Sequence, residues 1–178
     1  MKYVNIYTDG ACSGNQNDEN KGGWGAILSF AGTEKELFGG EDNTTNNRME
    51  LTALIKAFEA LKEDGLGLNI YSDSSYLINC FQKKWYEKWE KNGWINSKKE
   101  PVENQDLWEK ILANVRKHSC NFFLVKGHVN LEKPAEVKKA YTSFTSHNGP
   151  IEKDAFSVIL EYNNRCDELA TRFQRGIT

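Results

Sequence analysis

Two short segments of the chain, residues 5–9 and 69–73, share one pattern: Asn-Ile-Tyr-Thr-Asp in the first and Asn-Ile-Tyr-Ser-Asp in the second. Apolar and polar side chains alternate in both segments, as is typical of a strand with two different faces. An aspartate follows each predicted strand directly. If the strands are parallel neighbours, their spacing of about 4.8 Å brings Asp9 and Asp73 close together. Two ionised carboxylates at that distance repel each other, so one must be protonated or a cation must lie between them.

Each aspartate also has an ordinary structural explanation. Asp9 precedes Gly10, and Asp-Gly is typical of a turn, while Asp73 would be a suitable N-cap for a helix that begins at Ser74. The shared pattern favours one common site over two separate explanations. Sites in open α/β sheets form outside the carboxyl ends of strands, and hard divalent cations such as Mg²⁺ bind carboxylates there while keeping waters for a substrate.

A third carboxylate, Glu50, lies in the first turn of a helix that we predict from about 46 to 63. Leu54 and Phe58 recur behind it at helical spacing, which places Glu50 on or beside the apolar face. A carboxylate in that position is costly unless it is capped, paired or bound to a metal. The alternative is a capping box in which Asn47 is the N-cap and Glu50 returns the hydrogen bond.

The remaining pattern predicts an α/β fold, a mixed sheet with helices packed on it. Strands come first as a meander and then alternate with helices. We expect strands at 3–8, 23–30, 33–39, 68–72 and 122–125, a loop at 11–22, and helices at 46–63, 74–81, 105–117 and 163–175.

Residues 129–162 do not follow this rhythm. They contain two of the three prolines, a Thr-Ser-Phe-Thr-Ser run and weak periodicity. We interpret this stretch as an insertion within a single domain spanning 1–178, with one short helix near 135–140. Long loops in compact domains are usually functional or mobile, so we expect a flap beside a site. The apolar side chains that would dock part of it on the domain are Phe144, Phe156, Val158, Ile159 and Tyr162.

The composition indicates an ordinary globular protein without a strong overall field. The chain has 178 residues, a net charge of −2 and four scattered cysteines without a CxxC pair, which predict reduced thiols. The sequence passes directly into a strand pattern, with neither a signal peptide nor a transmembrane pattern. We therefore expect a cytoplasmic monomer with no membrane partner.

Five motifs, in order along the chain, resemble ribonuclease H of type 1, the bacterial form. They are Tyr-Thr-Asp-Gly-Ala-Cys-Ser-Gly-Asn at 7–15, Thr-Thr-Asn-Asn-Arg-Met-Glu-Leu at 44–51, Ser-Asp-Ser at 72–74, Val-Lys-Gly-His at 125–128 and Asn-Arg-Cys-Asp-Glu-Leu-Ala at 164–170. The resemblance implies the ribonuclease H fold, a five-stranded mixed sheet with helices on both faces. It also implies endonucleolytic hydrolysis of the RNA strand of RNA–DNA hybrids, leaving 5′-phosphate and 3′-hydroxyl ends.

The resemblance also implies the roles of individual residues. Asp9, Glu50, Asp73 and Asp167 match four metal-binding carboxylates, which would hold two Mg²⁺ ions about 4 Å apart, with Mn²⁺ as an alternative ion. His128 matches a histidine that assists proton transfer or product release, a task that suits an imidazole near neutral pH. The ordinary explanations are a first-turn position in the last helix for Asp167 and a loop histidine for His128.

Residues 83–100 combine six lysines and three glutamates with Trp85, Trp89 and Trp94. Lysines supply salt-dependent affinity for phosphates, and aromatic faces pack on sugars or bases. The alternative is an amphipathic helix with tryptophans in the core and lysines in solvent. The resemblance favours the basic protrusion that grips the DNA strand, and it implies an RNA–DNA hybrid as partner. The implied substrate contacts are Tyr76 and Trp85 on deoxyribose, Thr45 and Asn104 on a DNA phosphate, and Gly14, Asn15, Asn46 and Asn47 on the RNA strand and minor groove.

Two departures affect these substrate contacts. Asn43 stands where some relatives have arginine in the phosphate pocket, and Ser75 replaces a glutamine that contacts a base edge. Two other functions stay open: a non-catalytic module that binds hybrids, and a DNA nuclease or resolvase on the same fold. The binding module does not need all four acids, and the DNA nuclease does not need the segments that face RNA.

Overall fold

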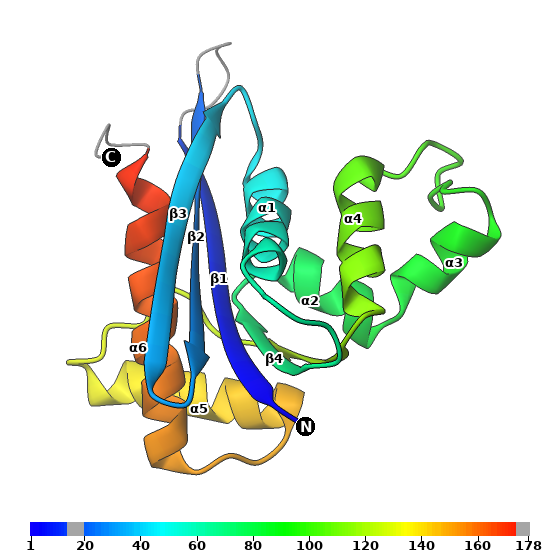
Figure 1. The fold of residues 1–178 in the computed structure, drawn as a ribbon. Helices are drawn as coiled ribbons and strands as arrows, with labels where there is room; N and C mark the ends of the chain where they lie inside the picture. Colours follow the sequence, from blue (N-terminus) through cyan, green and yellow to red (C-terminus); the bar gives the residue numbers. More distant parts are fainter. Residues whose placement is uncertain (14–19, 174–178) are drawn as a thin grey trace.

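The computed structural model describes residues 1–13 and 20–173, and it contains a five-stranded sheet in the order β3-β2-β1-β4-β5 (Figure 1). Strands β1, β2 and β3 pair antiparallel, whereas β4 pairs parallel to β1 and β5 pairs parallel to β4. The predicted mixed sheet is therefore confirmed. The strands are β1 Tyr3–Ser13, β2 Lys21–Phe30, β3 Thr33–Asp42, β4 Gly67–Ser72 and β5 Ser119–Leu124.

Helices cover both faces of this sheet, as predicted. In Figure 1, α1 and α4 lie on one side of the strands and α6 lies on the other, with α5 beneath the sheet in that view. The helices are α1 Asn46–Glu59, α2 Ser75–Gln82, α3 Trp85–Lys91, α4 Gln105–Val115, α5 Pro134–Asn148 and α6 Lys153–Arg172.

The alternating strand pattern separates two hydrophobic cores. Ile6 of β1 belongs to a first core with side chains of α1, α2 and α4, and its neighbour Tyr7 belongs to a second core with side chains of α5 and α6. Neighbouring residues of a strand point to opposite faces of the sheet, so each residue type meets a different helical layer. The second core includes a row of stacked rings across three strands, from Tyr7 through Tyr71 to Phe123.

Asp9 and Gly10 lie inside β1, although we expected the strand to end at Thr8, and the alternative explanation of Asp9 as a turn residue is wrong. The strand continues to Ser13 because its pairing with β2 runs on through Ser13 and Lys21. Gly10 instead allows α1 to pack closely on β1. A Cβ atom at that position would lie 2.4 Å from the backbone nitrogen of Glu50. The start of α1 therefore rests directly on the backbone of β1.

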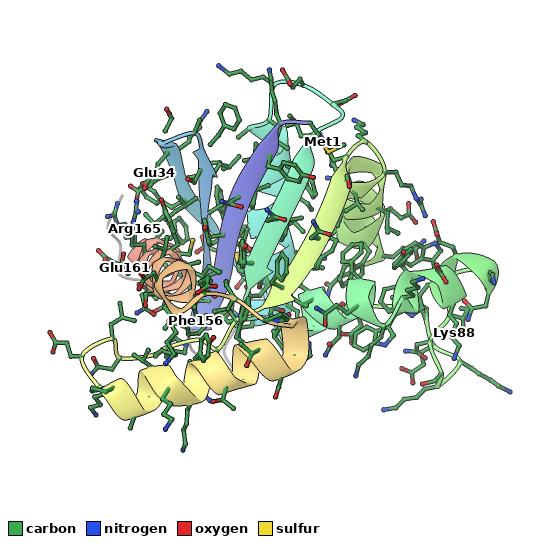
Figure 2. The ribbon with its side chains drawn as sticks, turned by 90° about the horizontal axis from the view of Figure 1, so that it is seen from below. Met1, Glu34, Lys88, Phe156, Glu161 and Arg165 are labelled. Atoms are coloured by element: carbon green, nitrogen blue, oxygen red, sulfur yellow. The ribbon has the colours of Figure 1, made fainter. Side chains whose placement is uncertain are left out.

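The segment 129–162 is largely helical, and the long loop expected there is not found. Helix α5 spans fifteen residues and α6 begins at Lys153, ten residues before the predicted start. Pro134 opens α5 at the first turn, where a proline is tolerated, and does not break it. Phe144 and Phe156 are buried in the second core, and Figure 2 shows Phe156 between α5 and the rest of the domain. We expected five side chains of this segment to dock on the domain, and for Val158 that prediction is wrong, because its side chain is 46% exposed.

Side-chain amides cover part of the outer edge of β5. The side chain of Asn148, at the end of α5, accepts a hydrogen bond from the Leu124 backbone N–H (3.1 Å) and donates one to the Leu124 carbonyl (2.8 Å). Gln82 donates to the Phe122 carbonyl at 2.9 Å, and its own side-chain oxygen lies 2.7 Å from His147 Nε2. The end of α5 is thus fastened to the strand that leads into the Val-Lys-Gly-His motif.

Candidate active site

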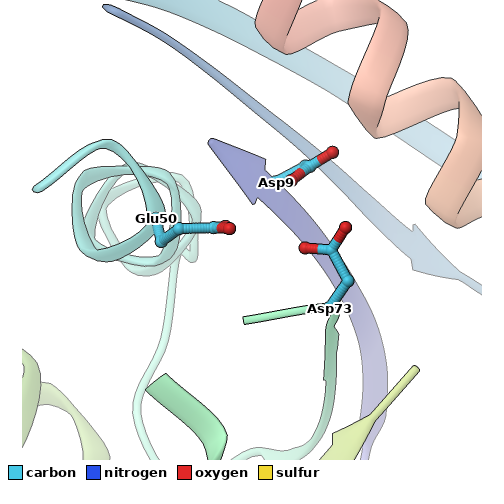
Figure 3. A group of neighbouring side chains, drawn as sticks. All are labelled: Asp9, Glu50 and Asp73. Carbon is cyan, nitrogen blue, oxygen red and sulfur yellow. The ribbon is translucent and has the colours of Figure 1, made fainter. Parts of the chain in front are cut away.

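Asp9 and Asp73 lie side by side, as the two matching segments predicted. The parallel register of β1 and β4 pairs Thr8 with Ser72, the residues directly before the two aspartates. Glu50 approaches from α1, and one carboxylate oxygen from each of the three residues lies within 4.8 Å of the other two. Figure 3 shows the three side chains converging from β1, α1 and the end of β4. We call Asp9, Glu50 and Asp73 the carboxylate centre.

Helix α1 begins at Asn46, as predicted, so Glu50 is its fifth residue and follows the first turn in which we expected it. The N-cap is Thr45, whose hydroxyl accepts a hydrogen bond from the backbone N–H of Arg48 at 3.1 Å. The alternative explanation, a capping box with Asn47 at the N-cap, is therefore wrong. Together with the contact between Gly10 and the Glu50 backbone, this start directs a buried glutamate towards Asp9.

Asp73 is not a helix cap either. Ser74 caps α2 by accepting a hydrogen bond from the Leu77 backbone N–H at 3.1 Å. The Asp73 carboxylate is packed against Gly127, where an added Cβ atom would lie 2.2 Å from its Oδ2. The glycine of the Val-Lys-Gly-His motif therefore leaves room for the Asp73 carboxylate, and any larger residue at this position would displace the Asp73 side chain.

The carboxylate centre is electrostatically unfavourable for three negative charges. Burial, followed by repulsion from Asp73 and Asp167, raises the pKa of Asp9 to about 9. Burial, followed by repulsion from Asp9 and Asp73, holds the pKa of Glu50 well above its ordinary value. Burial also raises the pKa of Asp73. These shifts are what closely spaced carboxylates show when no cation balances them.

The donor set fits a hard divalent cation. All three side chains offer carboxylate oxygens, the ligands that Mg²⁺ and Mn²⁺ prefer. The Glu50 Oε1 atom is buried and has no hydrogen-bond partner. Because an unpaired buried oxygen of an acidic group is costly, a bound cation would remove both this cost and the repulsion between the carboxylates.

Asp167 and His128 lie together at the border of this centre. Asp167 is close enough to raise the pKa values of Asp9 and Asp73, although it is outside the close group of three in the part of the chain that the structure describes. His128 Nδ1 is 3.6 Å from Asp167 Oδ2, and the His128 side chain is 76% exposed. Since α6 begins at Lys153, Asp167 is in the later half of the helix, and its explanation as a first-turn residue is wrong.

The expected substrate residues are distributed over several elements. Thr45, Asn46 and Asn47 are exposed at the start of α1, one turn before Glu50. Gly14 and Asn15 lie outside the residues that the structure describes.

Tyr76 and Asn104 belong to one hydrogen-bonded network. The Tyr76 hydroxyl accepts from Asn104 Nδ2 at 3.2 Å and from Trp108 Nε1 at 2.9 Å. Arg48 donates to Asn104 Oδ1 at 3.1 Å and forms a two-pronged ion pair with Asp106. Sequence reasoning missed Arg48, which joins the start of α1 to that of α4; its arginine–aspartate pairing carries no periodic signal, because the partners are far apart in the sequence.

The tryptophan–lysine segment, residues 83–100, contains α3 and the turns around it. All six lysines are exposed. Trp85, Trp89 and Trp94 are half-buried and pack on the first core, with ring centroids 6.4 Å apart for the first pair and 5.7 Å for the second. The amphipathic alternative and the basic surface thus coexist, because each tryptophan is partly covered and partly available.

Two further observations concern the cysteines and the apolar character of the helices. All four cysteines are free thiols, as predicted. Among the described residues, no helix has the length and apolar character needed to cross a membrane.

Comparison with known proteins gives consistent matches over nearly the whole chain. A family model described as RNase H matches residues 1–174. The chain is 47% identical to a ribonuclease H of Thermoanaerobacter sp. over 168 residues, 94% of this chain and 87% of that protein. It is 47% identical to a ribonuclease H of Chlorobium phaeobacteroides over 172 residues, 97% and 95% of the two chains. The fold resembles that of the type 1 enzyme LC9-RNase H1, with a TM-score of 0.65, 24% identity, and coverage of 92% and 85%.

Proposed function

Because this chain belongs to the ribonuclease H family, we propose that it hydrolyses the RNA strand of RNA–DNA hybrids as an endonuclease, leaving 5′-phosphate and 3′-hydroxyl ends. The observation that carries the proposal is the carboxylate centre, in which Asp9, Glu50 and Asp73 converge from three elements. A module that only binds hybrids has no need for a buried group of like charges that destabilises its own fold.

The proposed mechanism uses two Mg²⁺ ions, with Mn²⁺ as an alternative. Asp9, Glu50, Asp73 and Asp167 would hold them, and the ions when bound supply activation of the attacking water and stabilisation of the leaving 3′ oxygen. The protein fixes three of these ligands before any ion binds: the β1–β4 register sets the two aspartates, and the Gly10 contact sets Glu50. His128, beside Asp167, would exchange a proton at its exposed ring with the reacting groups or the departing product.

The proposed substrate surface extends from the start of α1 to α3. Asn46 and Asn47, with Gly14 and Asn15, would contact the RNA strand, whose 2′-hydroxyls both donate and accept hydrogen bonds. Thr45 and Asn104 would bind a DNA phosphate. Arg48 lies next to both and offers a guanidinium in the pocket where Asn43 supplies none.

Tyr76 and Trp85 would pack on deoxyribose, and the lysines of the tryptophan–lysine segment would add phosphate affinity. We expect the protein to act as a monomer in the cytoplasm, and we interpret 1–178 as one catalytic domain in which 129–162 is an insertion.

The decisive experiment incubates the purified protein with RNA–DNA hybrid, duplex DNA or duplex RNA of one sequence, in Mg²⁺, Mn²⁺ or EDTA. We expect cleavage of the RNA strand of the hybrid with either ion, no cleavage in EDTA, and products with 3′-hydroxyl ends that a polymerase can extend. Cleavage of duplex DNA would favour the DNA nuclease. Hybrid binding without cleavage in either ion would favour the non-catalytic module.

A further inference from the structure

The turn that carries His128, residues 126–128, is anchored at both ends in the second core. Val125 before it is 1% exposed and Val129 after it is 4% exposed. Both valines belong to the same cluster as Phe144 of α5 and Phe156 of α6. Side chains from the helices of the 129–162 segment are therefore part of the core that anchors both ends of this turn.

One helix contacts the turn at two adjacent points. The side chain of Asn164 donates a hydrogen bond from Nδ2 to the carbonyl oxygen of Val129 at 2.9 Å. Asp167, three residues later on α6, lies 3.6 Å from the ring of His128. Residues three apart share one face of a helix, so the amide and the carboxylate hold consecutive parts of the same turn.

The backbone of the turn needs such support. His128 has a φ of 56°, in the left-handed region that residues other than glycine seldom adopt. Conformations of this kind persist only where the surrounding structure holds them. The side chain of His128 is 76% exposed, so burial does not fix its ring. The contacts that orient it are those of the turn itself.

We propose that Asn164 is a positioning residue for catalysis, which holds the carbonyl of Val129 and thereby keeps the His128 ring beside Asp167. The proposal rests on the proposed function and on the role of His128 in it. It also assigns a purpose to part of the 129–162 segment, because Phe144 and Phe156 help to form the core that anchors the turn, while Asn164, just after the segment, holds the turn in one place. Asn164 does not touch the carboxylate centre; it acts through His128.

Asn164→Ala removes the donor and should lower kcat on the hybrid about fivefold, the factor that corresponds to one hydrogen bond of ordinary net strength. KM should stay within about twofold, because the substrate surface on α1 and α3 is untouched. The matched control is Asn114→Ala in α4. Asn114 is also half-buried, and its Nδ2 donates to the Lys110 carbonyl at the same 2.9 Å. This control should leave kcat unchanged.

A double-mutant cycle with His128→Ala separates positioning from general damage to the fold. If Asn164 acts through His128, adding Asn164→Ala to His128→Ala should lower kcat by less than about twofold. An undiminished fivefold loss in the His128→Ala background would overturn the proposal, as would wild-type kcat in Asn164→Ala alone.

Amide hydrogen exchange of residues 126–130 provides a readout that does not depend on activity. Exchange there should be at least about tenfold faster in Asn164→Ala than in the wild type and in Asn114→Ala. If the wild-type protein does not cleave hybrids, the proposed function fails, whereas unchanged exchange in the turn overturns the anchoring itself. The two failures are therefore distinguishable.

Discussion

The carboxylate centre gathers like charges in a buried place, whereas the tryptophan–lysine segment spreads like charges over an exposed one. Asp9 and Glu50 are 3% and 6% exposed, and burial raises the pKa of each. The lysines at 83–100 are all exposed and lie in water that screens them. The first region carries a cost that a bound cation would relieve, and the second carries almost none. This difference predicts that substitutions in the first region abolish catalysis without loss of hybrid affinity, and that substitutions in the second region do the reverse.

The largest effect should follow from Asp9→Asn. Removing one carboxylate from the centre should lower kcat on the hybrid by about 10³-fold or more, because several kcal/mol of transition-state stabilisation by metal ions depends on the complete ligand set. Hybrid affinity, measured by fluorescence anisotropy in Ca²⁺, should change less than about threefold. Asp64→Asn, a change at an exposed aspartate beyond α1, is the control and should keep wild-type kcat. An active Asp9→Asn enzyme would remove Asp9 from the site.

A smaller effect, on affinity alone, should follow from replacing Lys84, Lys88 and Lys91 with alanine. The dissociation constant for the hybrid should rise about tenfold at low salt, and the dependence of log K on log salt should become shallower by up to about 0.9 for each phosphate that a lysine no longer neutralises. The rate at saturating hybrid should stay within about twofold. Lys2, Lys35 and Lys62 surround a hollow near the start of β1, and the same triple change there is the control. Equal losses of affinity in both variants would show that only net charge matters.

The pH dependence of stability should also distinguish the two regions. The folded-state pKa of Asp9, about 9, is above its ordinary value of 3.8, so the folded state binds this proton more tightly than the unfolded chain does. In metal-free protein this stabilisation is fully present below pH 3.8, the ordinary pKa of an aspartate, and it is lost as the pH rises through about 9. The melting temperature in EDTA should therefore fall by about 5 °C or more between pH 5 and pH 9.

Calorimetry in EDTA measures this, with Asp9→Asn and the triple lysine variant as the comparison. The slope should be flatter in Asp9→Asn, which cannot ionise at that position, and unchanged in the lysine variant. Added Mg²⁺ should raise the melting temperature more at pH 9 than at pH 6, because metal binding requires deprotonated ligands. A melting temperature that rises with pH in EDTA would contradict the assigned direction.

The smallest effect should come from Thr45, the N-cap of α1. Thr45→Ala removes the hydroxyl that accepts from Arg48, and it should reduce the free energy of unfolding by about 1 kcal/mol. It should also weaken hybrid binding about threefold, because the DNA phosphate loses the proposed hydrogen bond from the Thr45 hydroxyl. Thr45→Ser keeps the hydroxyl and should restore both. Denaturant unfolding and anisotropy measure the two effects, and restored stability without restored binding would remove Thr45 from the phosphate pocket.

The sequence predicted the sheet and the paired aspartates well, because both depend on local alternation. Tyr7 and Tyr71 have the same phase in their strands, and the observed register pairs them directly. The predicted end of the first strand at Thr8 was wrong, because Gly10 does not end the strand but allows close contact with Glu50, forty residues away in the sequence. Only tertiary packing reveals such a contact.

The second failure concerns residues 129–162. Helix α5 buries only Ala140 and Phe144, so its apolar face is narrow, and its Thr and Ser residues have weak helix propensity. Its stability comes from packing on β5 and α6, which no window of sequence contains. The N-cap was missed for a similar reason: Thr45 and Asn47 are both good caps, and the choice between them depends on how α1 meets β1.

The amides on the outer edge of β5 have a consequence for the behaviour of the protein in a crowded solution. An exposed edge strand offers unpaired backbone groups to which another chain can add, and aggregation often begins there. Asn148 occupies both backbone groups of Leu124, and Gln82 occupies the carbonyl of Phe122. These side chains stand where an incoming strand would form hydrogen bonds to the C-terminal half of β5, so this part of the edge is blocked without any additional strand.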